Sequence, residues 1–127
     1  MSISEELKYD SDGLIPAIIQ DAENGDLLMV GYMNPESVER TLKEGKACFW
    51  SRSRQKFWVK GESSGHFLFV KEVLVDCDKD ALLVKATQAG PTCHEGYRSC
   101  FFRKITPEGE MEVISERMFD PSEVYKK

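Results

Sequence analysis

The sequence lacks the features of membrane, secreted and thiol redox proteins. Residues 1–6 contain no basic start followed by an apolar run, so we expect no signal peptide. No apolar stretch approaches the about 20 residues that a membrane-spanning helix needs. No two cysteines have the CxxC spacing, which argues against a thiol redox protein. We therefore expect a cytoplasmic protein with reduced cysteines and no membrane partner.

Basic residues are also scarce relative to acidic ones. Lys and Arg total 17 against 22 Asp and Glu, which gives a formal net charge of -5. An acidic chain repels a phosphate backbone, so we expect no nucleic-acid partner. The 127 residues, 41% of them hydrophobic, fit one domain over residues 1–127 with a single core. Such a small core leaves room for stabilisation by a metal or a partner subunit.

The N-terminal half predicts a hairpin followed by a helix. Residues 14–20 and 27–33 are apolar runs typical of strands, and the Asn-Gly pair between them favours a tight turn. A helix over about residues 35–44 is predicted because Asn34 suits the N-cap, proline suits the first turn and a glycine follows the last turn.

The remaining chain predicts mostly strands. The candidate strands lie at residues 47–50, 66–77, 81–87, 97–105 and 111–118. An Asp-Pro pair at residues 120–121 indicates a short C-terminal helix. These elements predict an α+β fold, predominantly antiparallel β. The sheet would be either twisted and open or a barrel-like roll, with one main helix.

An acidic segment at residues 76–80 is the first candidate metal site. On a strand, side chains alternate between faces, so Asp76, Asp78 and Asp80 would share one face while Cys77 points to the other. Three carboxylates on one face suit a hard cation such as Mg²⁺. The alternative is a solvated acidic turn between two strands, where aspartate is common.

A second segment, residues 90–100, carries two cysteines and a histidine. Cys93 and Cys100 lie seven residues apart, and His94 follows the first of them. Together with Cys77 they supply three thiolates, which leave a fourth zinc position open for water, as in catalytic zinc sites. The alternative is that these are ordinary thiols beside a surface histidine.

A polar segment at residues 50–66 combines cations, serines, glycines and both tryptophans. Arginine, lysine, hydroxyls and backbone amides bind phosphate, and tryptophan stacks on a base, so the segment predicts a nucleotide site. The alternative is an edge hairpin with a charged solvent face. The candidate substrate-binding residues are Trp50, Ser51, Arg52, Ser53, Arg54, Trp58, Lys60, Gly61, Ser63, Ser64, Gly65 and His66, with Thr92 from the cysteine segment.

These three segments, in this order, resemble the phosphoribosyl-AMP cyclohydrolase family of histidine biosynthesis. The matching stretches are GLIPA at residues 13–17, YMN at 32–34, WSRSR at 50–54, WVKGESSGH at 58–66, DCDKD at 76–80 and GPTCH at 90–94, closed by Cys100 and Phe101. The resemblance covers most of the chain, and such joint matches are far more specific than any single motif.

The resemblance implies a homodimer of mostly β fold with active sites at the subunit interface. It implies one Zn²⁺ per subunit on Cys77, Cys93 and Cys100, with Cys77 coming from the other subunit. One Mg²⁺ per subunit would lie on the three aspartates. The implied reaction is hydrolysis of the N1–C6 bond in the adenine ring of 1-(5-phosphoribosyl)-AMP by a zinc-activated water. Its product is the phosphoribosylformimino-AICAR-phosphate intermediate.

His94 is the predicted proton-transfer group, because it neighbours a zinc ligand and histidine titrates near neutral pH. The main alternative function is a nucleotide- or RNA-binding module with a structural zinc. That module predicts a closed site with His94 as fourth ligand, and unfolding when the metal is chelated. The enzyme predicts an open zinc position and loss of activity before loss of fold.

Overall fold

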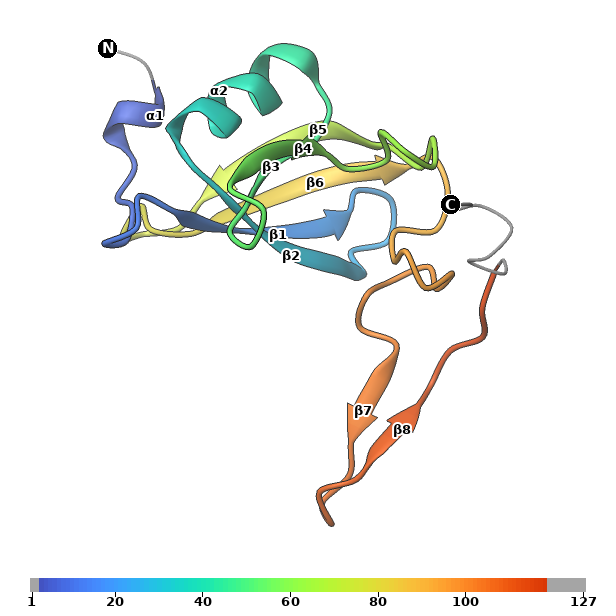
Figure 1. The fold of residues 1–127 in the computed structure, drawn as a ribbon. Helices are drawn as coiled ribbons and strands as arrows, with labels where there is room; N and C mark the ends of the chain where they lie inside the picture. Colours follow the sequence, from blue (N-terminus) through green and yellow to red (C-terminus); the bar gives the residue numbers. More distant parts are fainter. Residues whose placement is uncertain (1–2, 119–127) are drawn as a thin grey trace.

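The computed structural model describes residues 3–118, which form an open sheet with two small hairpins and two helices (Figure 1). The elements are α1 (Ile3–Glu6), β1 (Ile15–Asp21), β2 (Leu27–Met33), α2 (Pro35–Glu44), β3 (Cys48–Ser51), β4 (Lys56–Val59), β5 (Leu68–Val75), β6 (Leu82–Gln88), β7 (Arg103–Ile105) and β8 (Met111–Val113). No helix within residues 3–118 has the length and apolar character needed to cross a membrane.

The central sheet has four strands in the order β2-β1-β6-β5. β1 pairs antiparallel with β2, and β5 pairs antiparallel with β6, whereas β1 and β6 run parallel. The predicted α+β class with mostly antiparallel pairing is therefore confirmed. The barrel-like alternative is wrong, because β2 and β5 do not pair and the sheet stays open at both edges.

One face of the sheet carries the core beneath α2 and the β3–β4 hairpin (Figure 1). Side chains alternate along each central strand, so every second residue faces inward. The inward residues of β1 and β6 are Ile15, Ala17, Ile19, Leu82, Val84 and Ala86, all buried. Phe49 of β3 is fully buried against them and fixes the hairpin over the sheet.

The opposite face of the sheet carries an apolar row that crosses all four strands. Strand register aligns Val30 of β2 with Ile18 of β1, Ile18 with Leu83 of β6, and Leu83 with Leu74 of β5. Val30 is 46% exposed and Leu74 39% exposed. Within the described chain, this apolar row is thus only partly covered.

Helix α2 has the predicted bounds, and its ends show why. The Asn34 side chain accepts a hydrogen bond from the Ser37 backbone, and the Ser37 hydroxyl accepts one from the Asn34 backbone, which forms a capping box. Gly45 ends the helix in the left-handed conformation. Thr41 then accepts a hydrogen bond from the Cys48 backbone at 3.0 Å and ties the helix to β3.

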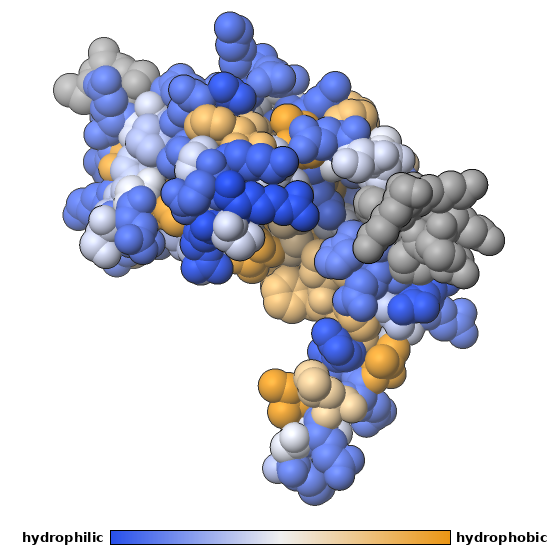
Figure 2. Space-filling view, viewed as in Figure 1, coloured by the Kyte–Doolittle hydropathy of each residue, from blue (hydrophilic) through white to orange (hydrophobic). Residues whose placement is uncertain are grey.

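The β7–β8 hairpin projects from the body as an arm (Figure 1). Predicted strands at residues 97–105 and 111–118 are wrong in length, because only their ends near the turn pair. Tyr97 and Phe102 instead stack in a separate small core, with ring centroids 3.7 Å apart. Figure 2 shows apolar side chains along the arm. Ile105 is 77% and Met111 70% exposed.

The two ends of the chain remain to be compared with the sequence prediction. The short helix α1 was not predicted, because four residues carry too little periodicity to reveal a helix. The predicted C-terminal helix at residues 120–121 lies outside the described residues.

Gly31→Ala is expected to lower the free energy of unfolding by about 1–3 kcal/mol, the range for overpacking a core. A methyl group at Gly31 would lie 2.5 Å from a ring carbon of Phe49, which is held by the core. Urea denaturation of the variant would measure the change. Lys71→Ala, on the exposed edge strand β5, serves as the control and should leave the unfolding midpoint unchanged.

Candidate functional site

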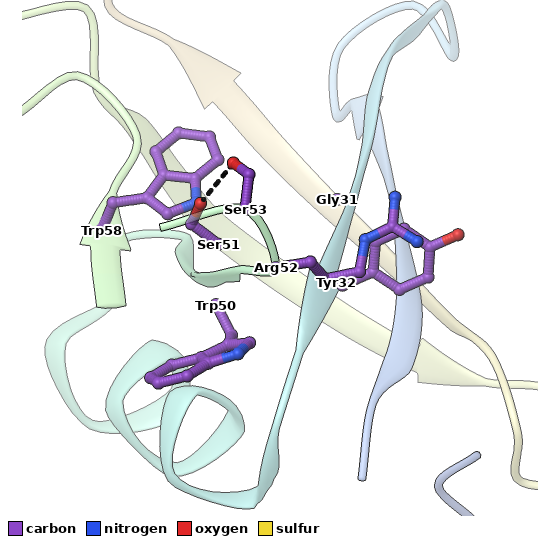
Figure 3. A pocket seen from close by; sticks show the side chains of 7 residues that line it. All are labelled: Gly31, Tyr32, Trp50, Ser51, Arg52, Ser53 and Trp58. Atoms are coloured by element: carbon purple, nitrogen blue, oxygen red, sulfur yellow. Dashed lines mark hydrogen bonds between the residues drawn. The ribbon is translucent and has the colours of Figure 1, made fainter. Parts of the chain in front are cut away.

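An open groove of about 510 Å³ lies between the edge strand β2 and the β3–β4 hairpin (Figure 3). Its lining residues are Gly31, Tyr32, Trp50, Ser51, Arg52, Ser53 and Trp58. Five of these belong to the candidate substrate-binding residues of the polar segment. The structure thus brings part of that segment together around one space.

The register of the β3–β4 hairpin explains which side chains face the groove. Phe49 pairs with Trp58, and their rings pack with centroids 4.9 Å apart, so Trp58 rests on the core. The turn that follows β3 carries Arg52 and Ser53 to the groove, and Gln55 in this turn has a φ of 53°. The packed rings of Phe49 and Trp58 therefore support a short polar turn.

Tyr32 is a groove residue that sequence reasoning did not single out. The Arg52 guanidinium carbon lies 4.0 Å from the centroid of its ring, a cation–π contact that Figure 3 shows. On the other side, the Ser51 and Ser53 hydroxyls lie 3.4 Å apart. The only sequence signal for Tyr32 was its place in the YMN stretch. The groove thus offers ring faces for a base and donors for a phosphate.

The rest of the polar segment turns away from the groove toward residues 90–100. The loop after Lys60 is compact, because a methyl group on Gly61 would meet the His66 backbone at 2.5 Å. The His66 ring packs on Gly90, where a methyl group would lie 2.5 Å from a ring carbon. Arg54 and Ser63 are exposed. The candidate substrate-binding residues therefore divide between the groove and the cysteine segment.

Hydrogen bonds fix the fold of the cysteine segment. Thr92 is fully buried, its backbone N–H donates to the Arg98 carbonyl at 3.0 Å, and its hydroxyl accepts from the Gln88 amide at 2.5 Å. The Cys100 backbone N–H donates to the Leu28 carbonyl at 2.7 Å. The segment is thereby attached to the end of β6 and to β2, and the Thr92 hydroxyl already has a protein partner.

This attachment brings two of the predicted zinc ligands together. The Cys93 and Cys100 thiols are hydrogen-bonding neighbours, and Cys93 is 4% exposed. Although part of Cys100 faces solvent, its thiol is desolvated, and this burial together with the Cys93 charge raises the pKa of Cys100 to about 12. The charges of Cys100 and Cys93 both favour the protonated form of the buried Lys60, whose pKa burial lowers. His94 is exposed at the edge of this cluster.

Cys77 does not join the other two cysteines within the chain. It lies in the turn before β6, whereas Cys93 and Cys100 follow the far end of that strand (Figure 1). The seven residues of β6 separate the two places by about 20 Å. Accordingly, no three ligand-type side chains meet at one point anywhere in residues 3–118.

The acidic segment forms a turn, so the prediction of one strand face for Asp76, Asp78 and Asp80 is wrong. The Asp76 carboxylate accepts hydrogen bonds from the backbone N–H groups of Asp80 at 3.0 Å and Ala81 at 3.3 Å. An aspartate whose carboxylate accepts hydrogen bonds from backbone N–H groups a few residues later favours a turn over an extended strand. The hydrogen bond shared with Asp76 raises the pKa of Asp80, so the two carboxylates lie close together.

An ion-pair cluster around Arg98 holds the cysteine segment against the β1–β2 hairpin, and sequence spacing gave no sign of it. The guanidinium donates to Asp21 at 2.5 Å and to Asp26 at 2.7 Å. The Glu23 backbone N–H and the Arg98 guanidinium together lower the pKa of the buried Asp21. Arg98 lies between the two cysteines, so this ion pair fixes their position.

Comparisons with known proteins give one family name. Residues 29–102 match the family model described as phosphoribosyl-AMP cyclohydrolase. A protein of that name from Chlorobium phaeovibrioides is 52% identical over 126 residues, which are 99% of this chain and 92% of that protein. Another from Pelotomaculum thermopropionicum is 54% identical over 97% of this chain and 95% of its own length. A third, from Chlorobaculum tepidum, is 53% identical over 99% of this chain and 92% of its own length.

Asp21→Asn is expected to reduce the free energy of unfolding by about 1–3 kcal/mol at neutral pH, because a charge-assisted hydrogen bond is lost. The lowered pKa of Asp21 means that its stabilisation is complete above the ordinary carboxyl pKa and disappears as pH falls through the lowered value. The difference between wild type and variant should therefore shrink in acid.

Urea denaturation of both proteins across a pH series would measure this difference. Asp12→Asn, an exposed aspartate in the loop before β1, is the matched control. If the difference in free energy of unfolding between wild type and Asp21→Asn stayed constant down to strongly acidic pH, the role of the Asp21 charge would be contradicted.

Proposed function

The chain belongs to the phosphoribosyl-AMP cyclohydrolase family, and on that premise we propose that it opens the adenine ring of phosphoribosyl-AMP at a zinc site shared between two copies. The reaction is a hydrolysis in histidine biosynthesis in which water breaks the N1–C6 bond of the ring. The resemblance drawn from the sequence motifs is confirmed by the family model and by relatives more than half identical.

The placement of the three cysteines carries the proposal of a shared site. Cys93 and Cys100 meet at one end of the sheet, and Cys77 lies at the other end, beyond the length of β6. A twofold axis perpendicular to the strands reverses their direction in the second copy. The partner subunit's Cys77 then lies at the same end as the Cys93–Cys100 pair, and each dimer has two equivalent sites.

The surface of the chain supports a second copy as the partner. The partly covered apolar row from Val30 to Leu74 crosses the sheet face that a reversed partner would cover. The β7–β8 arm exposes Ile105 and Met111, and an isolated two-stranded hairpin is only marginally stable in water. Burying both surfaces against an identical chain would remove apolar area from solvent and stabilise the arm.

The Cys93–Cys100 pair has the chemistry of a zinc site. Two adjacent thiols beside a buried ammonium suit a divalent cation that prefers sulfur ligands. Cys93, Cys100 and the partner subunit's Cys77 would hold Zn²⁺. When bound with three protein ligands, zinc lowers the pKa of a water molecule at its fourth position. The chain's own residues must then bind the nucleotide, orient C6 toward this position and move protons.

The turn at residues 76–80 would hold Mg²⁺ next to the shared site. Asp76 lies close enough to Asp80 to raise its pKa, chiefly through a shared hydrogen bond, and two such neighbouring carboxylates suit a hard cation. Asp78 follows Cys77 directly, and its carboxylate lies 3.6 Å from the Cys77 sulfur. In the proposed dimer, magnesium would therefore lie near zinc and could screen a substrate phosphate.

The groove would bind the nucleotide itself. Trp58 and Tyr32 present aromatic rings, and Arg52 with the Ser51 and Ser53 hydroxyls supplies hydrogen-bond donors. Outside the groove, Arg54 and the 63–65 loop would contact the second ribose phosphate. Stacking and charge-assisted hydrogen bonds together would fix the orientation of the ring.

His94→Ala is expected to lower kcat by about 10²–10⁴-fold, the usual range for removal of a proton-transfer group. Because His94 is exposed, the variant should keep its fold, which circular dichroism would verify. Ring opening would be followed by ultraviolet absorbance with phosphoribosyl-AMP, zinc and magnesium. An unchanged kcat would remove the proton role of His94 and leave the shared metal site untouched.

Mixing two inactive variants tests the shared site directly. Cys77→Ala and Cys93→Ala should each abolish ring opening, because each removes one zinc ligand from every site. When the two variants are unfolded together and refolded as a mixture, about one quarter of wild-type activity should return, since half of the dimers are mixed and each contains one intact site.

A refolded sample of each variant alone is the control and should stay inactive. No recovery in the mixture would contradict the shared site, because a site built within one chain would remain damaged in both partners. Full activity of Cys93→Ala alone would contradict the zinc proposal as a whole.

A further inference from the structure

Lys60 is a buried cation in an unusual position. It directly follows β4, its backbone N–H donates to the Ala47 carbonyl at 3.1 Å, and only 9% of the residue is exposed. Lysine is almost never buried to this degree unless its charge is paired. A nearby group must therefore compensate the positive charge of the Lys60 ammonium.

No carboxylate fills that requirement among residues 3–118. None of the ion pairs in this part of the chain includes Lys60. The Trp58 ring centroid lies 5.9 Å from the ammonium nitrogen, at the outer limit of a cation–π contact. The groups whose charge favours the ammonium are Cys100 and Cys93, while burial lowers the pKa of Lys60. The Cys100 and Cys93 side chains are thus the groups that can offset this charge.

The fold explains why Lys60 faces the cysteine segment and not the groove. The loop that follows it lies against the segment, since the His66 ring packs on Gly90 and the Ala89 backbone N–H donates to the Phe67 carbonyl at 3.0 Å. Lys60 does not line the groove. Lys60 therefore lies on the side of the cysteine segment, away from a phosphate bound in the groove.

We propose that Lys60 compensates the charge of the Cys93 and Cys100 thiolates in the zinc site and is not a phosphate ligand. The proposal rests on the zinc site of the proposed function. Three thiolates and Zn²⁺ carry a net charge of about -1, which is costly in a desolvated place. An ammonium in the same desolvated place would offset this charge, much as outer-shell partners support metal ligands. Lys60 thereby raises metal affinity without touching the metal.

Metal titration of the purified full-length chain tests this role without substrate. Lys60→Met keeps the length of the side chain and removes only the charge, so the fold should persist. The metal-stripped variant should bind Zn²⁺ about 10–100-fold more weakly than wild type in competition with a chromophoric chelator. The thiolate-to-metal charge-transfer band of the Co²⁺-substituted protein should also shift. Lys60→Arg should recover most of the affinity, because it restores a cation.

Lys56→Met is the matched control, since it removes an exposed cation from the same strand and should leave Zn²⁺ affinity unchanged. The proposal would be overturned if Lys60→Met bound Zn²⁺ as tightly as wild type and left the Co²⁺ band unshifted. A raised KM for the nucleotide in that variant would then indicate a phosphate ligand. Wild-type protein that binds no Zn²⁺ would instead overturn the underlying zinc site, so the two failures are distinct.

Discussion

The length of β6 is the constraint on which the rest of the structure depends. This strand is held in the middle of the sheet by parallel pairing to β1 and antiparallel pairing to β5, so its two ends cannot approach each other. Cys77 lies before one end, and Cys93 and Cys100 lie after the other. A zinc site that used all three cysteines, as we propose, would therefore need a second copy of the chain, because a strand of about 20 Å separates Cys77 from the other two.

Polar contacts fix the cysteine end of the sheet. Gln88 donates hydrogen bonds to the Thr92 hydroxyl and the Arg98 carbonyl, and Arg98 forms ion pairs with the β1–β2 hairpin. Few apolar side chains support this loop, so polar contacts set its shape. Such fixing suits a site that must present two thiols at a constant separation. The neighbouring ammonium of Lys60 belongs to the same arrangement.

Local signals in the sequence predicted elements whose stability is itself local. Helix α2 was predicted within its bounds because an N-cap and a C-terminal glycine act over a few residues. The hairpin at β1 and β2 followed from an Asn-Gly turn between apolar runs. The acidic segment was predicted wrongly as a strand, because Asp76 satisfies the backbone of its own turn and alternation of side chains does not apply there.

The sequence by itself determined which chemistry is present: three cysteines, a run of aspartates and a polar segment whose motifs identify the family. Only the tertiary structure decided which of these groups meet, because contacts such as Arg98–Asp21 and Lys60 with the thiols join residues far apart in the chain. Composition and spacing cannot reveal burial, and burial is what distinguishes Lys60 from exposed cations of the same segment such as Lys56. The parallel pairing of β1 with β6 likewise depends on long-range packing, and it helps to hold β6 extended between Cys77 and the Cys93–Cys100 pair.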